Sequence, residues 1–148
     1  MKKVLIILLA IFFIIFLIRF LEGRKNSPNF SYNSHIKIGN TKLYVEIADT
    51  EEKRTLGLGG RKNLPQNAGM LFSFKIPAKY SFWMKDMNFP LDIIWVSENK
   101  KITAISKNIS PNTYPSSFSP SEVVKYVVEV NARWAENNKI NAGDIVEF

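Results

Sequence analysis

The sequence contains no cysteine and a single histidine, His35, among its 148 residues. The lack of cysteine excludes a disulfide framework, a thiolate metal site and a cysteine nucleophile. A metal site built from several histidines is excluded as well. We therefore expect neither a metal nor a cofactor, and His35 is most simply a surface residue.

Excess negative charge is also lacking, and the positive charge is unevenly spread. The formal net charge is +7, and five basic residues against one glutamate contribute +4 of it before residue 35. The remaining fifteen basic and twelve acidic residues leave only +3 for the rest of the chain. No basic stripe or recognition-helix pattern accompanies this charge. Nucleic acid is therefore not an expected partner.

A long hydrophobic run stands at the N-terminus. Residues 4–18 (VLIILLAIFFIIFLI) are all apolar, and two more apolar residues extend the run to residue 21 past Arg19. Eighteen helical residues span about 27 Å, close to the thickness of a bilayer's hydrocarbon core. We expect residues 1–21 to form a membrane-anchoring transmembrane helix. A cleaved signal segment is the alternative, but no A-x-A pattern follows Leu21.

Residues 22–34 (EGRKNSPNFSYNS) have the composition of a flexible tether. Positive charge flanks both ends of the hydrophobic run, so the positive-inside rule does not settle its orientation. A short N-terminus before such a segment usually stays inside. We therefore expect a single-pass protein of the cell membrane whose globular part lies outside the cytoplasm, where an envelope ligand or a protein partner would bind.

Residues 35–148 are expected to form one β-rich domain. Strands are predicted at 35–38, 42–48, 70–74, 80–84, 92–97, 101–107, 125–130 and 144–148 from alternation, β-branched residues and turn signals. A short helix is predicted over 50–58, with Asp49 and Glu52 as a capping box, and one or two helical turns over 132–138. Residues 108–120 read as a long surface loop. The fold class is mainly β, a single β-sandwich or partly closed barrel with one or two short helices.

Two segments, GLGGRKNLPQNAGMLFSF and FWMKDMNFPLDIIWV, strongly resemble the domain of unknown function 192 family. The resemblance implies a mostly β fold of the sandwich type, often exported or membrane-tethered in prokaryotes, without an established enzymatic activity. The family's signature positions here are Arg61, Gly69, Met70, Phe72, Phe82, Trp83, Met84, Lys85, Pro90 and Asp92.

The chain departs from the family pattern in three places. Gly59 stands where a methionine is frequent, and Arg133 follows Ala132 where a glycine is common. A cysteine that the family commonly carries in the long loop is missing between residues 108 and 120. Any chemistry that depended on that cysteine is absent from this chain.

Four residues are predicted to form a ligand-binding face: Arg61, Trp83, Lys85 and Asp92. Alternation over residues 80–85 puts Trp83 and Lys85 on a mixed face, which is more open to solvent than the apolar one. Arg61 follows two glycines, where its guanidinium can clamp an anion. It can equally brace the loop through an ion pair with Asp92 or Glu129. We favour a module that binds without catalysing a reaction.

Two alternatives stay open. A hydrolase of cell-envelope glycans could use Asp92 and Glu129 as its two carboxyls, which requires both to face one cavity at roughly 5–10 Å. A structural interaction module is the other, in which the aromatic cluster around Trp83 is entirely core. That reading predicts no pocket beside Trp83.

Overall fold

A computed structural model describes residues 13–14 and 34–148 of the chain. Within these ranges, no helix is both long enough and apolar enough to cross a membrane. The predicted anchor, residues 1–21, lies outside the described residues apart from Phe13 and Ile14. The predicted tether, residues 22–34, does so too apart from Ser34, with which the folded domain begins.

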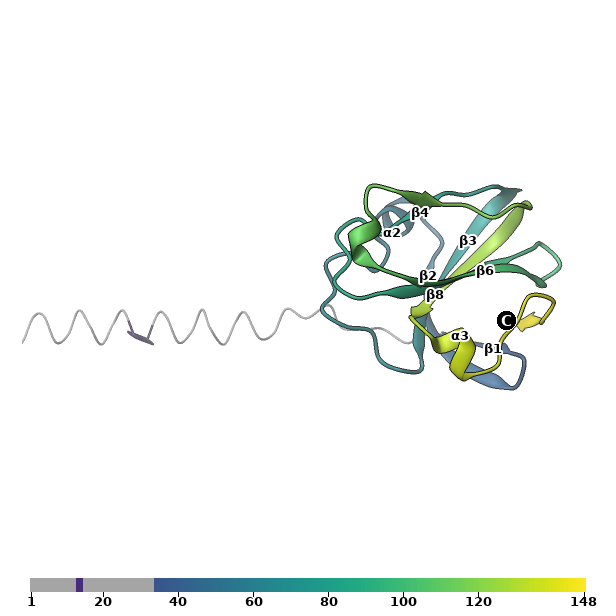
Figure 1. Cartoon of the computed structure of the whole chain (residues 1–148), viewed down its shortest axis with the longest axis horizontal. Coiled ribbons are helices and arrows are strands. Elements are labelled where there is room, and N and C mark those ends of the chain that lie inside the picture. The colour runs from purple at the N-terminus through teal and green to yellow at the C-terminus, as the bar shows by residue number, and fades with distance from the viewer. Residues whose placement is uncertain (1–12, 15–33) are drawn as a thin grey trace, which may run out of the picture.

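The domain is built on one seven-stranded sheet (Figure 1). The strands follow the order β6-β5-β8-β3-β2-β1-β9 across the sheet, and all neighbours are antiparallel except the parallel pair β2 and β3. They are β1 (Ser34–Ile38), β2 (Thr41–Ala48), β3 (Ala68–Ala78), β5 (Leu91–Val96), β6 (Ile102–Ile109), β8 (Val124–Asn131) and β9 (Val146–Glu147).

The two edges of this sheet curl toward each other. Lys101, just before β6, forms a bridge with Ile145, just before β9. The amide of Ile102 donates to Asp144 O at 2.9 Å, and the amide of Val146 donates to Lys100 O at 2.9 Å. The domain is therefore a curled, partly closed barrel, and the sandwich alternative is wrong.

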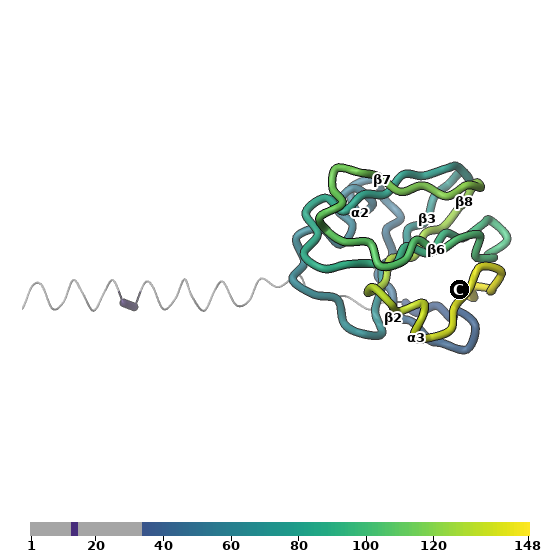
Figure 2. The backbone as a smooth tube through the Cα atoms, in the orientation of Figure 1, coloured from purple at the N-terminus to yellow at the C-terminus, as the bar shows by residue number. Residues whose placement is uncertain are grey.

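Short elements cover the two faces. On one side lie α2 (Glu51–Leu56) and a small second sheet in which β4 (Phe82–Trp83) pairs with β7 (Ser117–Phe118). A single 3-10 turn, η1 (Pro111–Thr113), precedes β7. On the other side lies α3 (Trp134–Asn137). Figures 1 and 2 show α3 well separated from α2 and from the β4–β7 pair.

Both faces of the central strands are buried, and two apolar clusters result. The first, inside the curl, contains Ile36, Leu43, Val45, Ile94, Val128, Val130 and Trp134, among others. The second, under α2 and β4, contains Leu58, Met70, Phe72, Met84, Ile93, Trp95 and Val127, among others. Consecutive residues of one strand alternate between the clusters, so all six residues of β5 are buried.

The predicted strands and helices are largely confirmed, with a shifted cap on the first helix. Thr50, rather than Asp49, caps α2, because its side chain accepts from the Lys53 amide at 3.3 Å. The Asp49 carboxylate instead pairs with Lys53 Nζ at 2.8 Å. The Lys53 pair lowers the pKa of Asp49, and a hydrogen bond to its own backbone, followed by one to the Thr50 side chain, lowers the pKa of Glu52. Because Thr50 is the N-cap residue, Asp49 lies one residue before the helix cap.

Three predicted segments differ from the structure. Residues 70–74 were expected to end before a connection, but β3 continues through Pro77 to Ala78, with an irregular register to β8 after Ser73. The predicted strand 80–84 shortens to the two residues of β4. Residues 108–120 are not only loop, since they hold the end of β6, η1 and all of β7. β7 forms because it has a partner, β4, more than thirty residues earlier in the chain.

Several signature positions are structural. Met70 and Met84 are buried in the second cluster, and the exposed Pro90 accepts from the Ala132 amide at 3.1 Å. At Gly69 a Cβ atom would lie 2.6 Å from the carbonyl oxygen of Glu129. No side chain fits there without moving β8 away from β3. Gly69 therefore sets the close approach of the two strands at Glu129.

Asp92 is completely buried on β5. Its Oδ1 accepts from the amides of Asn108, at 2.8 Å, and Arg133, at 3.2 Å. Its Oδ2 accepts from the amide of Ala135 at 3.0 Å. The carboxylate thus joins the end of β6 and the start of α3 to the centre of the sheet.

Asp92→Asn should lower the free energy of unfolding by about 2–4 kcal/mol, because the amide group presents a donor where a backbone N–H needs an acceptor. Urea unfolding followed by the fluorescence of the buried Trp95 and Trp134 measures this loss. Asp144→Asn is the matched control, because that carboxylate accepts one backbone amide, from Asn141 at 2.8 Å. Equal losses in the two variants would contradict the role assigned to Asp92.

Candidate functional site

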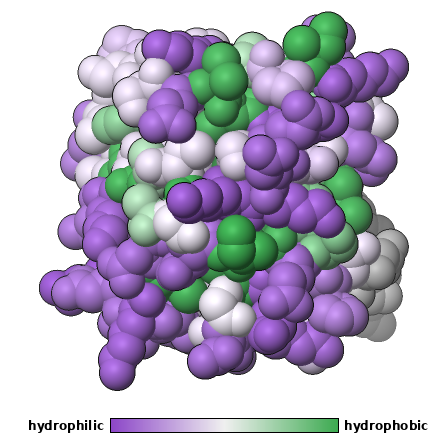
Figure 3. All heavy atoms as spheres, turned by 90° about the vertical axis from the view of Figure 1, so that its right-hand side faces the viewer, coloured by the Kyte–Doolittle hydropathy of each residue, from purple (hydrophilic) through white to green (hydrophobic). Residues whose placement is uncertain are grey.

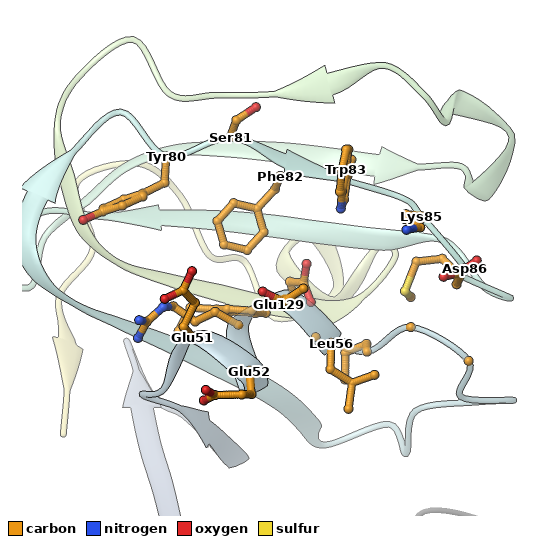
Figure 4. Close-up of a pocket in the computed structure, with 18 of the residues that line it drawn as sticks. Glu51, Glu52, Leu56, Tyr80, Ser81, Phe82, Trp83, Lys85, Asp86 and Glu129 are labelled. Atoms are coloured by element: carbon orange, nitrogen blue, oxygen red, sulfur yellow. The ribbon is translucent and has the colours of Figure 1, made fainter.

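A cleft of about 920 Å³ opens between α2 and β4 (Figure 4). Its lower wall is α2 with the glycine loop that follows it, and its upper wall is the segment from Tyr80 to Met87. Two hydrogen bonds join the walls to each other at one end. The amide of Gly60 donates to Asp86 O at 2.8 Å, and Asn88 Nδ2 donates to Arg61 O at 2.9 Å.

Five aromatic rings line the cleft: Phe72, Phe74, Tyr80, Phe82 and Trp83. Phe72 and Phe82 meet edge to face with centroids 4.8 Å apart, and Phe74 stacks on Tyr80 with centroids 3.5 Å apart. The Tyr80 hydroxyl donates to the Ile76 carbonyl. The opposite edge of Phe82 packs against the buried Trp95 at 5.5 Å. This wall is held by its own packing and does not need a ligand to be ordered.

Trp83 and Lys85 lie on the open side of the cleft, as alternation predicted. Trp83 is 53% exposed, whereas Met84, between the two, is 1% exposed. Lys85 Nζ lies 5.9 Å from the centre of the Trp83 ring, and Tyr114 meets the same ring edge to face at 6.0 Å. A pocket therefore does exist beside Trp83, contrary to the interaction-module alternative.

Glu129 lies on the floor of the cleft, between the aromatic wall and α2 (Figure 4). It belongs to β8, is 5% exposed, and its Oε2 is buried without a hydrogen-bond partner. Burial raises the pKa of Glu129 to about 8, and the nearby charge of Arg61 opposes this increase. The carboxyl is therefore mostly protonated at neutral pH.

The helical wall brings further polar groups to the cleft. Arg54 donates to Ser73 O at 3.0 Å, and its guanidinium carbon lies 5.2 Å from the centre of the Phe74 ring. Glu51 and Glu52 stand in the first turn of α2, and Leu56, at its end, is 68% exposed. The rim is thus part acidic, part apolar.

Arg61 braces the structure, but its ion-pair partner is neither of the two predicted. It is 7% exposed, and its Nη2 donates to Glu46 Oε2 on β2 at 2.8 Å. Its charge also acts on Glu129. Arg61 is not among the residues that line the cleft. Its guanidinium supports the floor from behind.

The four predicted binding residues do not line one cleft. Trp83 and Lys85 do, Arg61 lies behind the floor, and Asp92 lies on the other face of the sheet. Asp92 pairs with Val130 of the first cluster, whereas Ile93 of the second cluster pairs with Glu129. Asp92 and Glu129 therefore point to opposite faces of the sheet and cannot face one cavity. The prediction of a glycan hydrolase that uses these two carboxyls is wrong.

Sequence reasoning missed the floor and the helical wall. Glu129 had been considered only as the second carboxyl of a hydrolase or as an ion-pair partner of Arg61. The signal for a site of its own was present, because it is the single carboxylate in the strand sequence YVVEV. A charged residue in such a strand is either paired, exposed or functional. Among the described residues, no group of three or more His, Asp or Glu side chains is arranged to hold a metal ion.

The free energy of unfolding should decrease as the pH rises from 5 to 9. Between the ordinary glutamate pKa of 4.5 and the folded value of about 8, the folded domain keeps a proton that the unfolded chain has lost. Ionising Glu129 therefore destabilises the folded state, by a few kcal/mol at most. Below pH 4.5 the carboxyl is protonated in both states and the effect disappears.

Urea unfolding at pH 5, 7 and 9 measures this slope. Glu129→Gln should remove it and be more stable than the unchanged chain at pH 9, since an amide cannot ionise. Glu98→Gln, at an exposed ion pair with Lys125, is the control. Parallel slopes in the unchanged chain and Glu129→Gln would refute the assignment.

The solved structures that resemble this chain include the following two. A putative transcription regulator (R01717) from Sinorhizobium meliloti 1021 is 28% identical with a TM-score of 0.73, over 76% of this chain and 91% of that one. A protein of unknown function from Novosphingobium aromaticivorans DSM 12444 is also 28% identical with a TM-score of 0.73, over 77% and 84% of the two chains. No curated protein matches.

The family comparison agrees with the signature seen in the sequence. The match covers the whole folded domain, from the first residue of β1 to residue 148. It is to DUF192, a family described as "Uncharacterized ACR". By this match over residues 34–148, the chain belongs to the DUF192 family.

Proposed function

We propose that this protein is a membrane-tethered module that binds a small ligand in the cleft between α2 and β4 without transforming it. One observation carries the proposal: an ordered aromatic wall faces a floor with a single buried carboxyl, in a cleft large enough for a small molecule. Apolar pockets of this size with few polar groups are typical ligand sites.

The polar groups of the cleft favour binding over catalysis. Glu129 cannot act with Asp92, which lies on the other face and is saturated by backbone amides. Lys85 stands at the open lip beside Trp83 and away from the floor (Figure 4). A buried carboxyl next to an aromatic wall can orient a ligand, whereas a paired acid and base would be needed to cleave a glycosidic bond.

The membrane location rests on the sequence. Residues 4–21 are long and apolar enough to span a bilayer, and residues 22–34 provide a tether of polar composition. The domain surface suits an aqueous setting. In the view of Figure 3, hydrophilic side chains predominate and hydrophobic ones form small, separate groups. We place the domain outside the cytoplasm, held near the membrane surface.

The cleft should bind 2-phenylethanol, a neutral probe whose ring fits the aromatic wall. The full-length chain in lipid nanodiscs, labelled with ¹³C at the methionine methyls, provides the readout. Met87 lines the cleft, whereas Met70 is buried in the second cluster and does not line the cleft. Only the Met87 signal should move in proportion to occupancy.

Combining Trp83→Ala with Lys85→Ala should weaken this binding about tenfold, because the open lip of the aromatic wall is lost. Both side chains are exposed, so the fold should survive. Ile76→Ala, an exposed apolar residue outside the cleft, is the matched control. Binding that survives the double substitution counts against the proposed site.

The membrane side can be tested because the chain has no cysteine of its own. Lys75→Cys places one thiol at an exposed position of β3. A membrane-impermeant maleimide should label this variant in intact cells, and the labelled chain should sediment with membranes. Labelling only after lysis would overturn the extracytoplasmic placement, and recovery in the soluble fraction would overturn the anchor.

A further inference from the structure

Glu129 is a buried acid with an unused hydrogen-bonding oxygen. Its Oε2 has no partner, and the residue is 5% exposed on the floor of the cleft. Native proteins rarely bury a polar atom in this way, because its lost hydration is not replaced. A partner supplied from outside the chain would replace it. The position on the cleft floor restricts that partner to whatever occupies the cleft.

Acidic side chains outnumber basic ones around the cleft, although the chain as a whole is basic at +7. Four carboxyls line it, those of Glu51, Glu52, Asp86 and Glu129, against two cationic side chains. Both cations lie over aromatic rings: Arg54 Cζ is 5.2 Å from the centroid of Phe74, and Lys85 Nζ is 5.9 Å from the centroid of Trp83. The aromatic faces of this cleft therefore accommodate positive charge.

Arg61 is the cation behind Glu129, and its position matters for any ligand charge. Its guanidinium donates to Glu46 at 2.8 Å and lies outside the cleft lining. Part of its charge is thus offset by Glu46. Its effect on Glu129 is smaller than that of burial, so it does not act as a full counter-ion.

Building on the proposed function, we propose that the cleft recognises the ammonium group of an organic amine, with Glu129 as its counter-ion and the aromatic wall around its hydrocarbon part. The ammonium donates an N–H to Oε2, which satisfies the orphaned oxygen. The rings of Phe72, Phe82 and Tyr80 contact the apolar part of the ligand and stabilise its charge. The acidic rim attracts the cation from solution.

A neutral ligand is the competing occupant. The protonated Glu129 could donate a hydrogen bond to a hydroxyl or carbonyl oxygen instead. The two occupants differ in their response to pH. An ammonium needs the ionised carboxylate, whereas an acceptor needs the protonated acid. The other charged groups that line the cleft all lie on its walls: Glu51, Glu52, Arg54, Lys85 and Asp86.

The test compares 2-phenylethylamine with 2-phenylethanol between pH 6.5 and 8.5, on the full-length chain in nanodiscs with Met87 as reporter. The amine has a pKa near that of lysine, about 10, so it stays cationic throughout. With a Glu129 pKa of about 8, its affinity should rise roughly 20-fold over this interval. The affinity of the alcohol should stay level or fall.

Glu129→Gln distinguishes the contact between the amine and Glu129 from partition of the amine into the nanodisc lipid, because the substitution does not alter that partition. At pH 8.5 it should weaken amine binding about tenfold or more and abolish the pH dependence. Glu98→Gln makes the same change of charge outside the cleft and should bind the amine as the unchanged chain does.

The outcomes are distinguishable. If the alcohol binds at least as tightly as the amine and binding weakens above pH 8, the amine proposal fails while the proposed cleft function stands. If both probes bind but Glu129→Gln changes neither, the amine proposal fails in the same way. If neither probe shifts Met87 at any pH, both the amine proposal and the proposed function fail.

Discussion

The structure depends on a sheet whose central strands are covered on both faces. Every side chain of β5 is buried, and β8 alternates between the two apolar clusters. A carboxyl on such a strand loses its hydration whichever way it points. β5 and β8 nevertheless carry one carboxyl each, Asp92 and Glu129. The two acids differ in their hydrogen bonding. Asp92 belongs to the structural framework, and Glu129 belongs to the candidate site.

Asp92 points inward and is fully satisfied. Three backbone amides replace its water, and in return the carboxylate fixes the end of β6 and the start of α3. Glu129, one strand away, points outward and keeps an oxygen without a partner. Gly69 makes that position possible, because any larger residue would push β8 away. Asp92 therefore stabilises the fold, whereas Glu129 lies on the cleft floor with an oxygen that can accept a hydrogen bond.

Local patterns predicted much of this architecture. Alternation in residues 80–85 predicted the buried and open faces correctly, and turn signals predicted the hairpin of β5 and β6. What local patterns miss is pairing over distance. β7 exists only because β4 lies beside it, and β3 continues past Pro77 because it pairs with β8 again at Ala78, after the irregular stretch that follows Ser73. The choice between sandwich and barrel likewise rests on a contact between residues 101 and 145.

The site was predicted only in part for the same reason. Trp83 and Lys85 were found because their exposure follows from a two-residue period on one strand. Asp92 and Glu129 could not be assigned to faces without the register that pairs Asp92 with Val130 and Ile93 with Glu129. Arg61 was expected to brace the loop, but its partner, Glu46, comes from β2 and depends on the parallel pairing with β3.

The position of β1 has a mechanical consequence. It is the first strand of the domain, and β2 holds it along all five residues while β9 holds it on the other side at Lys37 and Ile38. Tension on the chain before Ser34 would pull β1 along its own axis. Such a load falls on all of its backbone hydrogen bonds together and does not peel them off one at a time. If the domain were pulled at Ser34 while a ligand in the cleft held it in place, the backbone hydrogen bonds of β1 would share the force and resist unfolding together.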